Sequence, residues 1–515
     1  MSRQHSVKPR LLVLSLVALA AFTGFIAMPT DYPKTSSTAV TDTDQTIAAI
    51  ASREWRKADP DNNGFYPLIE GKDAFGTRLV LMDNAERSID AQYFLMKPDD
   101  AGLVFAHTMF EAADRGVRVR FLLDDIFTTV DDRALIYLNE HPNIELRIFN
   151  PIARKGIWVL NFLWHFSVTN RRMHNKSLTI DNQLSVVGGR NIAEEYFQLD
   201  TTGEFIDFDA VAAGPIVRDI SDSFDAYWNH ELAIPMNAFY DRVDVEEQEQ
   251  FRQGIDRRME ESGHSVYGDA VNRVLMQRRL TGGVDPYIAD ARAIIDDPQK
   301  LLERVSDEYK IVATEIAAAL DKAQSEILIY TPYFIPGKKG MELVERIRAR
   351  GVRIVLVTNS LASNNQILVH SAYSTYRKRL LAAGVELWEA RASAMEQIQD
   401  DGTRTFENST LHTKGIMIDR RFTFVGSLNL DPRSIDLNSE MGVMIDSEAM
   451  ATTLAERVTE NLPNSAYRLQ LDDNNRITWH ATIDGQQVVE TKEPLTSGWK
   501  RFKAWFWKIA PEGQL

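Results

Sequence analysis

Two stretches of the chain share one pattern: MHNKSLTIDNQLSVVGGRN at residues 173–191 and LHTKGIMIDRRFTFVGSLN at residues 411–429. Each contains H-x-K-x4-D, followed by an apolar run, a small residue and an asparagine. One such match arises easily by chance, but two matches with the same sequel and the same offsets do not. The sequence therefore predicts a duplicated structural unit that carries the same chemistry twice.

The sequence that precedes each motif is duplicated too. Residues 85–125 and residues 323–360 each contain a short apolar strand, an amphipathic helix and an RGVR turn into a second apolar strand. Gly116 and Gly351 stand in these turns, where the end of a helix favours a left-handed residue. The alternation of strand and helix indicates a parallel or mixed sheet with helices on its faces. The predicted fold class is therefore α/β, with two fused repeats in a pseudo-two-fold arrangement, each a mixed sheet flanked by helices.

The duplicated units also predict how the chain is divided. Arg3, Lys8 and Arg10 precede an uncharged run over residues 11–28, which is barely long enough to span a bilayer. The run is longer than a usual signal-peptide core and no clean A-x-A site follows it, so we interpret it as an uncleaved anchor, with a cleaved signal peptide as the alternative. The basic flank should stay in the cytoplasm, which places the rest of the chain across the membrane. The predicted segments are an anchor or signal segment (1–28), a linker (29–50), a first repeat domain (51–234), a charged connector (235–300), a second repeat domain (301–462) and a C-terminal tail (463–515).

In each motif the histidine and the lysine are two residues apart on a predicted strand, so both side chains point to one face. These candidate catalytic residues are His174 and Lys176 in the first motif and His412 and Lys414 in the second. The aspartate that completes each motif stands at a predicted hairpin turn. Asp181 and Asp419 complete the candidate catalytic set, and we interpret them as structural orienters rather than proton donors.

The return strand of each hairpin brings further polar groups back beside the histidine and the lysine. At identical offsets from the histidine, the first motif offers Gly189 and Asn191, and the second offers Ser427 and Asn429. These four are the candidate phosphate-binding positions. Each half can thus present an imidazole, an ammonium and an amide to a common point.

This set of groups suits phosphoryl transfer through a phosphohistidine. A neutral imidazole is a competent nucleophile, and a second, protonated imidazole can give its proton to the leaving oxygen. Lysines and amides can stabilise the charge on the non-bridging oxygens. The sequence lacks cysteine and contains no H-E-x-x-H motif, so we predict a reaction without a metal or another cofactor.

Composition narrows the range of partners. The formal net charge of −15 makes a nucleic acid partner unexpected, because a negatively charged surface repels the phosphate backbone. Any phosphate site must therefore be a local basic pocket. The absence of cysteine excludes disulfides and thiolate nucleophiles.

At these residues the chain resembles the phospholipase D superfamily, over about residues 51–462. The runs GGRNIAEEYF at residues 188–197 and GSLNLDPRS at residues 426–434, with LNSE at residues 437–440, are similar to bacterial cardiolipin synthases, as is the ending APEGQL at residues 510–515. The resemblance implies one active site between the halves, with His174 as nucleophile and His412 as acid and base. It also implies a carboxylate that orients each histidine, for which Glu440 and Asp207 are the candidates. Gly189 departs from the serine of the family pattern.

Three features favour a lipid substrate and a membrane location. The first is the N-terminal run. The second is GIWVLNFLWHFSV at residues 156–168, next to basic residues, for which a buried core segment is an equal alternative. The third is WKRFKAWFWK at residues 499–508, which suits an interfacial helix, with a helix docked on the domain as the alternative.

The predicted function is phosphatidyl transfer that makes cardiolipin from phosphatidylglycerol and a second phospholipid. The expected site of action is the bacterial inner membrane, with the catalytic domains on the periplasmic side. Hydrolysis of phospholipids to phosphatidic acid is the main alternative. A nuclease of the same superfamily and a non-catalytic membrane scaffold are the weaker alternatives.

Overall fold

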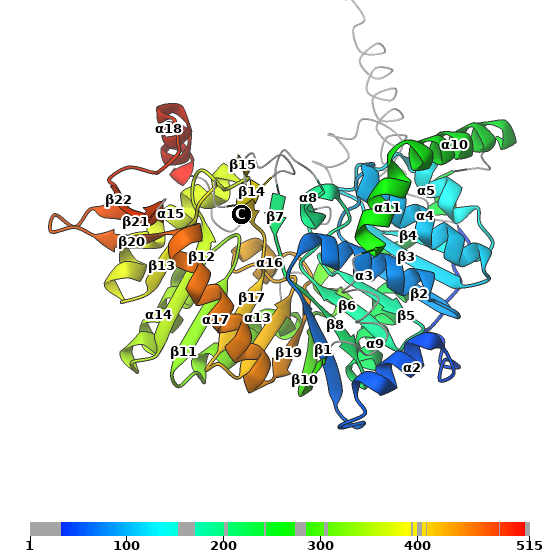
Figure 1. The fold of residues 1–515 in the computed structure, drawn as a ribbon, viewed down its shortest axis with the longest axis horizontal. Helices are drawn as coiled ribbons and strands as arrows, with labels where there is room; N and C mark the ends of the chain where they lie inside the picture. The colour runs from blue at the N-terminus through cyan, green and yellow to red at the C-terminus, as the bar shows by residue number, and fades with distance from the viewer. Residues whose placement is uncertain are drawn as a thin grey trace, which may run out of the picture.

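The computed structural model describes residues 32–152, 170–199, 204–240, 244–272, 285–302, 307–392, 395–398, 404–407, 409–483 and 485–509. The predicted N-terminal anchor, the aromatic stretch at residues 156–168 and the C-terminal run at residues 510–515 lie outside the described residues. Figure 1 shows two α/β halves side by side, with the N-terminal half in blue to green and the C-terminal half in green to red.

The first half is built on one mixed sheet. Its central strands β2, β3 and β4 are parallel, and the strands on either side of them are antiparallel. In spatial order the strands are β1 (Asn63–Leu68), β8 (Asp209–Ala213), β6 (Leu184–Gly188), β5 (Ser177–Ile180), β2 (Ser88–Tyr93), β3 (Arg118–Asp124), β4 (Ile144–Phe149) and β9 (Ala233–Pro235).

The second half repeats this order strand for strand. Its parallel core is β11, β12 and β13, and the motif hairpin pairs with β11 as the first hairpin pairs with β2. In spatial order the strands are β10 (Tyr287–Ile295), β19 (Met441–Asp446), β18 (Phe422–Gly426), β17 (Gly415–Ile418), β11 (Glu326–Tyr330), β12 (Arg353–Asn359), β13 (Glu386–Ala390) and β20 (Ala466–Leu471). The predicted duplication is therefore confirmed at the level of topology.

The helices of each half include two that connect successive parallel strands, as the strand–helix–strand pattern predicts, and others that lie before or after them in the chain. In the first half they are α2 (Ile47–Trp55), α3 (Gly71–Asp83), α4 (Asp100–Asp114), α5 (Asp132–Asn139), α8 (Glu194–Phe197) and α9 (Ile216–Asn229). In the second half they are α13 (Ile311–Asp321), α14 (Gly337–Ala349), α15 (Ile367–Ala382), α16 (Pro432–Asp436) and α17 (Glu448–Ser465). Gly116 and Gly351 follow α4 and α14 with φ of +94° and +87°, which is the left-handed helix end that the sequence predicts.

The halves share a hydrophobic core as well as having one each. Strands β1 and β10 pair at the edge where the two sheets meet. Next to this edge, Val187 and Ala210 of the first half pack in one cluster with Val425 and Val443 of the second. Because these residues lie on or beside the two motif hairpins, the shared core holds the hairpins against each other.

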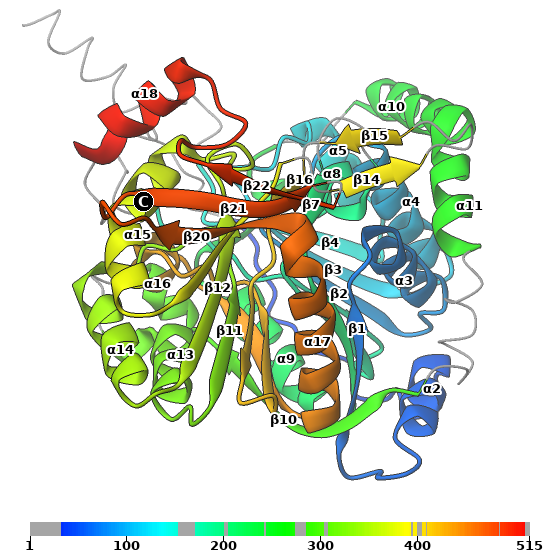
Figure 2. The same cartoon turned by 60° about the vertical axis from the view of Figure 1, so that its left-hand side comes forward.

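The predicted connector and tail both contain regular structure. Helices α10 (Val245–Arg258) and α11 (His264–Val271), with a π-helical turn between them, pack on the first half, where Arg258 pairs with Asp100 at 2.9 Å. Strand β10 begins at Tyr287, inside the range expected to be connector. In the tail, β20, β21 (Ile477–Ile483) and β22 (Gln486–Glu490) extend the second sheet and lead to α18 (Gly498–Phe506), as Figure 2 shows.

Within the described part of the chain, the structure contains no helix with the length and hydrophobicity needed to cross a bilayer.

Candidate active site

The two motifs form matching hairpins. Residues 181 and 182 between β5 and β6 have φ of +52° and +52°, and residues 419 and 420 between β17 and β18 have φ of +54° and +51°. Aspartate and asparagine tolerate this left-handed geometry, and Arg420 adopts it too. The predicted turns are therefore confirmed.

The motif aspartates tie these turns to the first central strand of each half. Each carboxylate accepts hydrogen bonds from three successive backbone N–H groups where that strand begins. The donors are Glu86, Arg87 and Ser88 for Asp181, and Gln324, Ser325 and Glu326 for Asp419. This arrangement agrees with the structural interpretation of both aspartates.

The backbone of each catalytic histidine is held by the opposite half. The N–H of His174 donates to the carbonyl of Ser439 at 3.0 Å, and the N–H of His412 donates to the carbonyl of Ile206 at 2.8 Å. The second contact continues a parallel pairing between β7 (Glu204–Ile206) and β16 (Ser409–Leu411), which come from different halves. The active site is thus assembled across the junction.

The carboxylates that contact the histidines cross over in the same way. His174 Nδ1 lies 2.8 Å from Glu440 of the second half, and His412 Nδ1 lies 2.6 Å from Asp207 of the first half. Both carboxylates come from the residue that follows the backbone contact just described. Both carboxylates are candidates from the sequence, but their contact with the histidine of the opposite half was not expected.

The departure at Gly189 has a steric cause. A Cβ at Gly189 would lie 2.3 Å from Asp207 Oδ1, so the glycine makes room for this carboxylate. At the equivalent position, the hydroxyl of Ser427 donates to Glu440. Ser427 therefore contacts Glu440 and Gly189 lies against Asp207, and the role of both positions in binding phosphate remains a prediction.

The two lysines are buried beside the histidines. Lys176 Nζ donates to the carbonyl of His174 at 2.6 Å, and Lys414 Nζ lies 2.7 Å and 3.3 Å from the two ring nitrogens of His412. Burial lowers the pKa of Lys176 to about 7 and that of Lys414 to about 8. An anion that enters the site would favour the charged form of both amines.

The electrostatics join the two clusters into one site. Burial, followed by the charges of Lys176 and Lys414, holds the pKa of His174 well below its ordinary value. Burial and Lys414 lower the pKa of His412 to about 3, and Lys176 contributes in the same direction. Each imidazole therefore feels the lysine of the opposite half, as one shared site requires.

The two orienting carboxylates differ in charge. Burial raises the pKa of Glu440 to about 7. Burial acts in the same direction on Asp207, but the charges of Lys414 and His412 outweigh it and lower the pKa of Asp207 to about 2. At neutral pH, Asp207 is ionised whereas Glu440 is close to its midpoint.

The two asparagines have unsatisfied polar atoms. The side-chain oxygens of Asn191 and Asn429 are buried without a hydrogen-bond partner among the described residues. Asn191 Nδ2 donates to the hydroxyl of Tyr196 at 2.9 Å. Buried polar groups normally have partners, so these two oxygens are positions where a ligand could complete the hydrogen bonding. The contacts of both amides with phosphate remain a prediction.

Aromatic side chains that the sequence analysis did not assign to the site enclose both imidazoles. Phe94 packs edge-on against His174 at 4.8 Å between ring centroids, and Phe205 stacks on His412 at 5.0 Å. Tyr196 meets His412 edge-on at 5.0 Å. Tyr196 belongs to a run that carries the family resemblance, whereas no motif marks Phe94 or Phe205. These rings help to bury both imidazoles, of which His174 is 6% and His412 is 8% exposed.

The donor set of this site is that of a phosphodiesterase that supplies its own positive charge. Among the described residues, no group of three or more histidine, aspartate and glutamate side chains is placed to hold a metal ion. The expectation of metal-independent turnover remains a prediction for experiment.

Comparison with known proteins adds a second kind of evidence. Residues 79–228 and 316–462 match the family model described as "Cardiolipin synthase, PLD-like domain". The chain is 35% identical to cardiolipin synthase C of Escherichia coli K12 over 463 residues, which covers 88% of this chain and 96% of that protein. It is 23% identical to cardiolipin synthase A of Proteus mirabilis over 378 residues, with 73% and 64% covered. The fold resembles the crystal structure of phosphatidylserine synthase from Haemophilus influenzae, with a TM-score of 0.53 and 14% identity, over 81% of this chain and 92% of that one.

Proposed function

The chain belongs to the phospholipase D superfamily as a cardiolipin synthase-like phosphatidyltransferase, and we propose that it transfers a phosphatidyl group to a hydroxyl of phosphatidylglycerol to form cardiolipin. The observation that carries this proposal is the crossed constellation. His174 and His412 are each held by a carboxylate of the opposite half and share the field of two lysines.

The geometry supports a first step at phosphorus. Because Nδ1 of His174 faces Glu440, its Nε2 carries the lone pair that attacks the phosphorus of the donor lipid. The bond from phosphorus to the head-group oxygen breaks, and that oxygen takes a proton from His412. Lys176 and Lys414 stabilise the negative charge on the non-bridging oxygens.

The second step reverses these roles. The hydroxyl of the acceptor lipid gives its proton to His412, and its oxygen attacks the phosphorus. The phosphorus–nitrogen bond then breaks, and its electron pair returns to His174. Water in place of the lipid hydroxyl would release phosphatidic acid, so the outcome depends on how well the site excludes water.

The electrostatics support this division of labour between the histidines. The ionised carboxylate of Asp207 acts to raise the pKa of His412, against burial and Lys414, which hold it at about 3. The negative charge of a bound phosphodiester would act in the same direction as Asp207, toward the protonated form that an acid requires. Glu440, whose pKa is about 7, gives His174 less stabilisation as a cation and leaves it neutral for attack.

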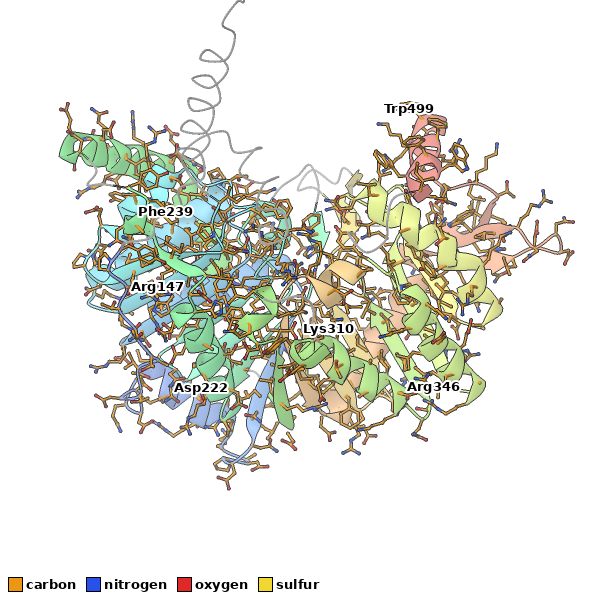
Figure 3. All side chains as sticks on the ribbon, turned by 180° about the vertical axis from the view of Figure 1, so that it is seen from behind. Arg147, Asp222, Phe239, Lys310, Arg346 and Trp499 are labelled. Atoms are coloured by element: carbon orange, nitrogen blue, oxygen red, sulfur yellow. The ribbon has the colours of Figure 1, made fainter. Side chains whose placement is uncertain are left out.

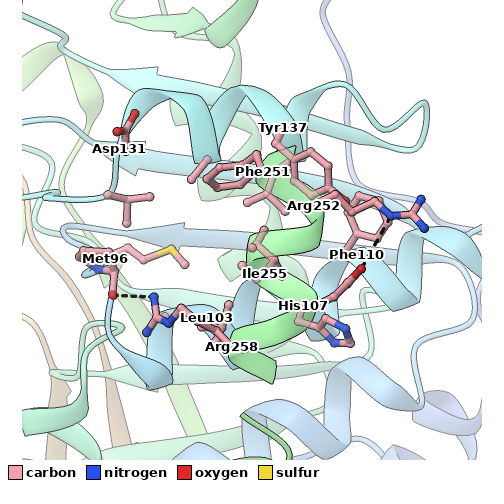
Figure 4. Close-up of a pocket in the computed structure, with 18 of the residues that line it drawn as sticks. Met96, Leu103, His107, Phe110, Asp131, Tyr137, Phe251, Arg252, Ile255 and Arg258 are labelled. Atoms are coloured by element: carbon pink, nitrogen blue, oxygen red, sulfur yellow. Dashed lines mark hydrogen bonds and ion pairs between the residues drawn. The ribbon is translucent and has the colours of Figure 1, made fainter. Parts of the chain in front are cut away.

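An apolar pocket beside the first motif supports a lipid substrate. Figure 4 shows this cavity of about 620 Å³ between α4, α5 and α10. Met96 lies at one end, and its backbone bridges to Ile192, the residue after the candidate phosphate-binding Asn191. Apolar lining residues include Leu103, Phe110, Tyr137, Phe251 and Ile255.

The second half also has an apolar pocket, but between the helices that correspond to α3 and α4 of the first half. A cavity of about 760 Å³ lies between α13 and α14, and Phe334 in its wall bridges to Leu430. Leu428 and Leu430 flank Asn429 and also line the cavity. One pocket next to each asparagine is what a reaction between two lipids would need, because each lipid has acyl chains to accommodate.

The location at a bacterial inner membrane, with the catalytic domains in the periplasm, is part of the proposal. It is supported by the uncharged run over residues 11–28 and its basic flank. The net charge of −15 makes a nuclease the weaker alternative.

Product analysis tests the proposal. The purified chain is incubated with labelled phosphatidylglycerol, alone and with phosphatidylethanolamine, and the lipids are separated by thin-layer chromatography. Cardiolipin that disappears in His174→Ala and in His412→Ala, with both variants folded, is the expected result. Phosphatidic acid alone would indicate a lipase, and cleavage of DNA would indicate a nuclease. Turnover that persists in either variant contradicts the paired mechanism.

A further inference from the structure

The C-terminal helix exposes an aromatic surface that the proposed chemistry does not use. Helix α18 and the 3-10 turn after it (Trp507–Ile509) expose Trp499 by 63%, Trp505 by 64% and Ile509 by 78%. Phe502, Phe506 and Trp507 are exposed as well, whereas Ala504 is buried against the protein. Figure 3 places Trp499 at the outer end of the molecule.

Basic residues accompany this aromatic surface. Lys503 and Lys508 are exposed beside these rings. Lys500 and Arg501 are half-buried, and each donates to a backbone carbonyl of the protein. Lys503 sits over the ring of Trp499 at 5.4 Å. In a chain with a net charge of −15, this is a local concentration of positive charge next to exposed indoles. Aromatic rings with a basic fringe suit the head-group region of an anionic bilayer.

The helix is held firmly on the second half. Glu493, which precedes α18, pairs with Arg377 of α15, and Arg377 also pairs with the buried Glu389 of β13 at 2.6 Å. Lys500 Nζ donates to the carbonyl of Ala362 at 3.1 Å. Polar contacts at its base therefore fix the helix while its aromatic surface stays free.

The loop that receives Lys500 also holds the strand that ends at the active site. Asn359 exchanges hydrogen bonds with the N–H and the carbonyl of Leu411, at 2.9 Å and 2.7 Å. Thr410 donates to the carbonyl of Ser363 at 2.8 Å. His412 follows Leu411, so only a few polar contacts separate α18 from the imidazole of His412.

Figures 1 and 2 show α18 at the same upper end of the molecule as β7 and α8, the elements that lead to Asp207. We propose that residues 498–509 bind the surface of an anionic lipid bilayer and fix the active site against it. This inference rests on the proposed function, because it supplies the orientation in which membrane lipids reach the paired histidines.

A site-specific label tests this inference independently of any N-terminal anchor. The chain has no cysteine, so Phe502→Cys introduces a single attachment point for an environment-sensitive fluorophore. Ile50→Cys on α2, 56% exposed at the opposite end of the molecule, provides the matched control. With the full chain on phosphatidylglycerol vesicles, we expect a blue shift at position 502 and quenching by lipid-borne nitroxides, with neither at position 50. Equal responses at the two positions, or no response at 502, would overturn the inference.

Turnover separates this inference from the proposed function. Ser in place of Trp499, Phe502 and Trp505 should reduce turnover of vesicle lipid about tenfold and leave turnover of a soluble short-chain phospholipid unchanged. The control Ile47→Ser with Ile50→Ser should change neither rate. Unchanged vesicle turnover in the triple variant contradicts membrane docking by α18. If the unmodified chain fails on the short-chain lipid as well, the proposed function itself is wrong, whereas the label still reports binding.

Discussion

Gly189 and Ser427 occupy equivalent positions, but the two halves place the carboxylate beside the histidine with different residues. Glu440 is one methylene longer than Asp207, and it reaches His174 with a serine hydroxyl as its neighbour. The shorter aspartate reaches His412 only because residue 189 has no side chain to obstruct it. The glycine and the aspartate thus form one matched pair, and the serine and the glutamate form another.

This matching predicts unequal effects for small changes at the two positions. Gly189→Ser should reduce kcat/KM about 100-fold, because the new side chain displaces Asp207 and misplaces His412. Ser427→Gly should cost about tenfold, since it removes only one hydrogen bond to Glu440. Rates with a soluble short-chain phospholipid test both, with melting temperatures as the control. Equal losses would contradict the steric explanation.

The buried lysines predict the alkaline pH dependence. The pKa values of about 7 for Lys176 and about 8 for Lys414 lie below the ordinary value for lysine, so both lose their positive charge as the pH rises through this range. Because kcat/KM reports the free enzyme, it should fall there, whereas kcat should fall at higher pH, since bound phosphate favours the ammonium. Lys176→Arg keeps its charge and should move the alkaline limb of kcat/KM upward, from about 7 toward the pKa of about 8 of Lys414. Coincident limbs in the wild type and the variant would argue against this assignment.

The charges of the carboxylates predict which histidine becomes phosphorylated. With a p-nitrophenyl phosphodiester, whose leaving group needs no acid, His412→Asn should form the phosphoenzyme at His174 and release it slowly. A burst of p-nitrophenol is expected in this variant and not in His174→Asn. The reverse pattern would exchange the two roles.

Among the helices, strands and turns, the sequence predicts those features that depend on a local pattern of residues. The glycines after α4 and α14 and the turns at Asp181 and Asp419 are local signals, and the structure has them as predicted. The placement of H-x-K on a strand was wrong, because β5 begins at Ser177 and β17 at Gly415, one residue after each lysine. The crossing of Glu440 and Asp207 was not predictable, because it depends on how the two halves pack. Phe94 follows the end of β2 and Phe205 lies on β7, and neither position belongs to a motif, so the sequence pattern contained no signal for these enclosing rings.

The motif aspartates should matter to folding rather than to the chemical step. Asp419→Ala removes the acceptor of three backbone N–H groups and should cost roughly 2 to 4 kcal/mol of stability. Burial tends to raise the pKa of Asp419, but these N–H groups hold it below its ordinary value of 3.8. Its contribution is therefore present above that pH and is lost as the pH falls. Denaturant titrations at neutral and acidic pH measure the difference, which should shrink in acid.

The folded fraction of Asp419→Ala should keep most of its activity. An inactive variant with a native melting temperature would instead assign Asp419 a direct catalytic role.

For the molecule as a whole, the duplication gives each half one motif hairpin and one asparagine, and each half also has an apolar pocket, although the two pockets lie between helices that do not correspond. The pockets were not predictable from the sequence, because the lining side chains come from helices that look like ordinary amphipathic packing. Phe251 and Ile255 illustrate this, since they are apolar positions on the otherwise charged helix α10. If the two pockets hold the acyl chains of two lipids, filling either one should slow transfer between long-chain lipids.

Ala317 and Ala318 on α13 provide a matched pair for this test. Ala317 lines the second cavity, whereas Ala318 is exposed on the other side of the helix. Ala317→Trp should lower kcat/KM for long-chain phosphatidylglycerol about tenfold, because an indole replaces the space that an acyl chain would fill. Turnover of a soluble short-chain phospholipid should stay the same, since its chains do not need the cavity. Ala318→Trp should change neither rate. Equal losses on both substrates would indicate a disturbed fold, and no loss on the long-chain lipid would show that acyl chains bind elsewhere.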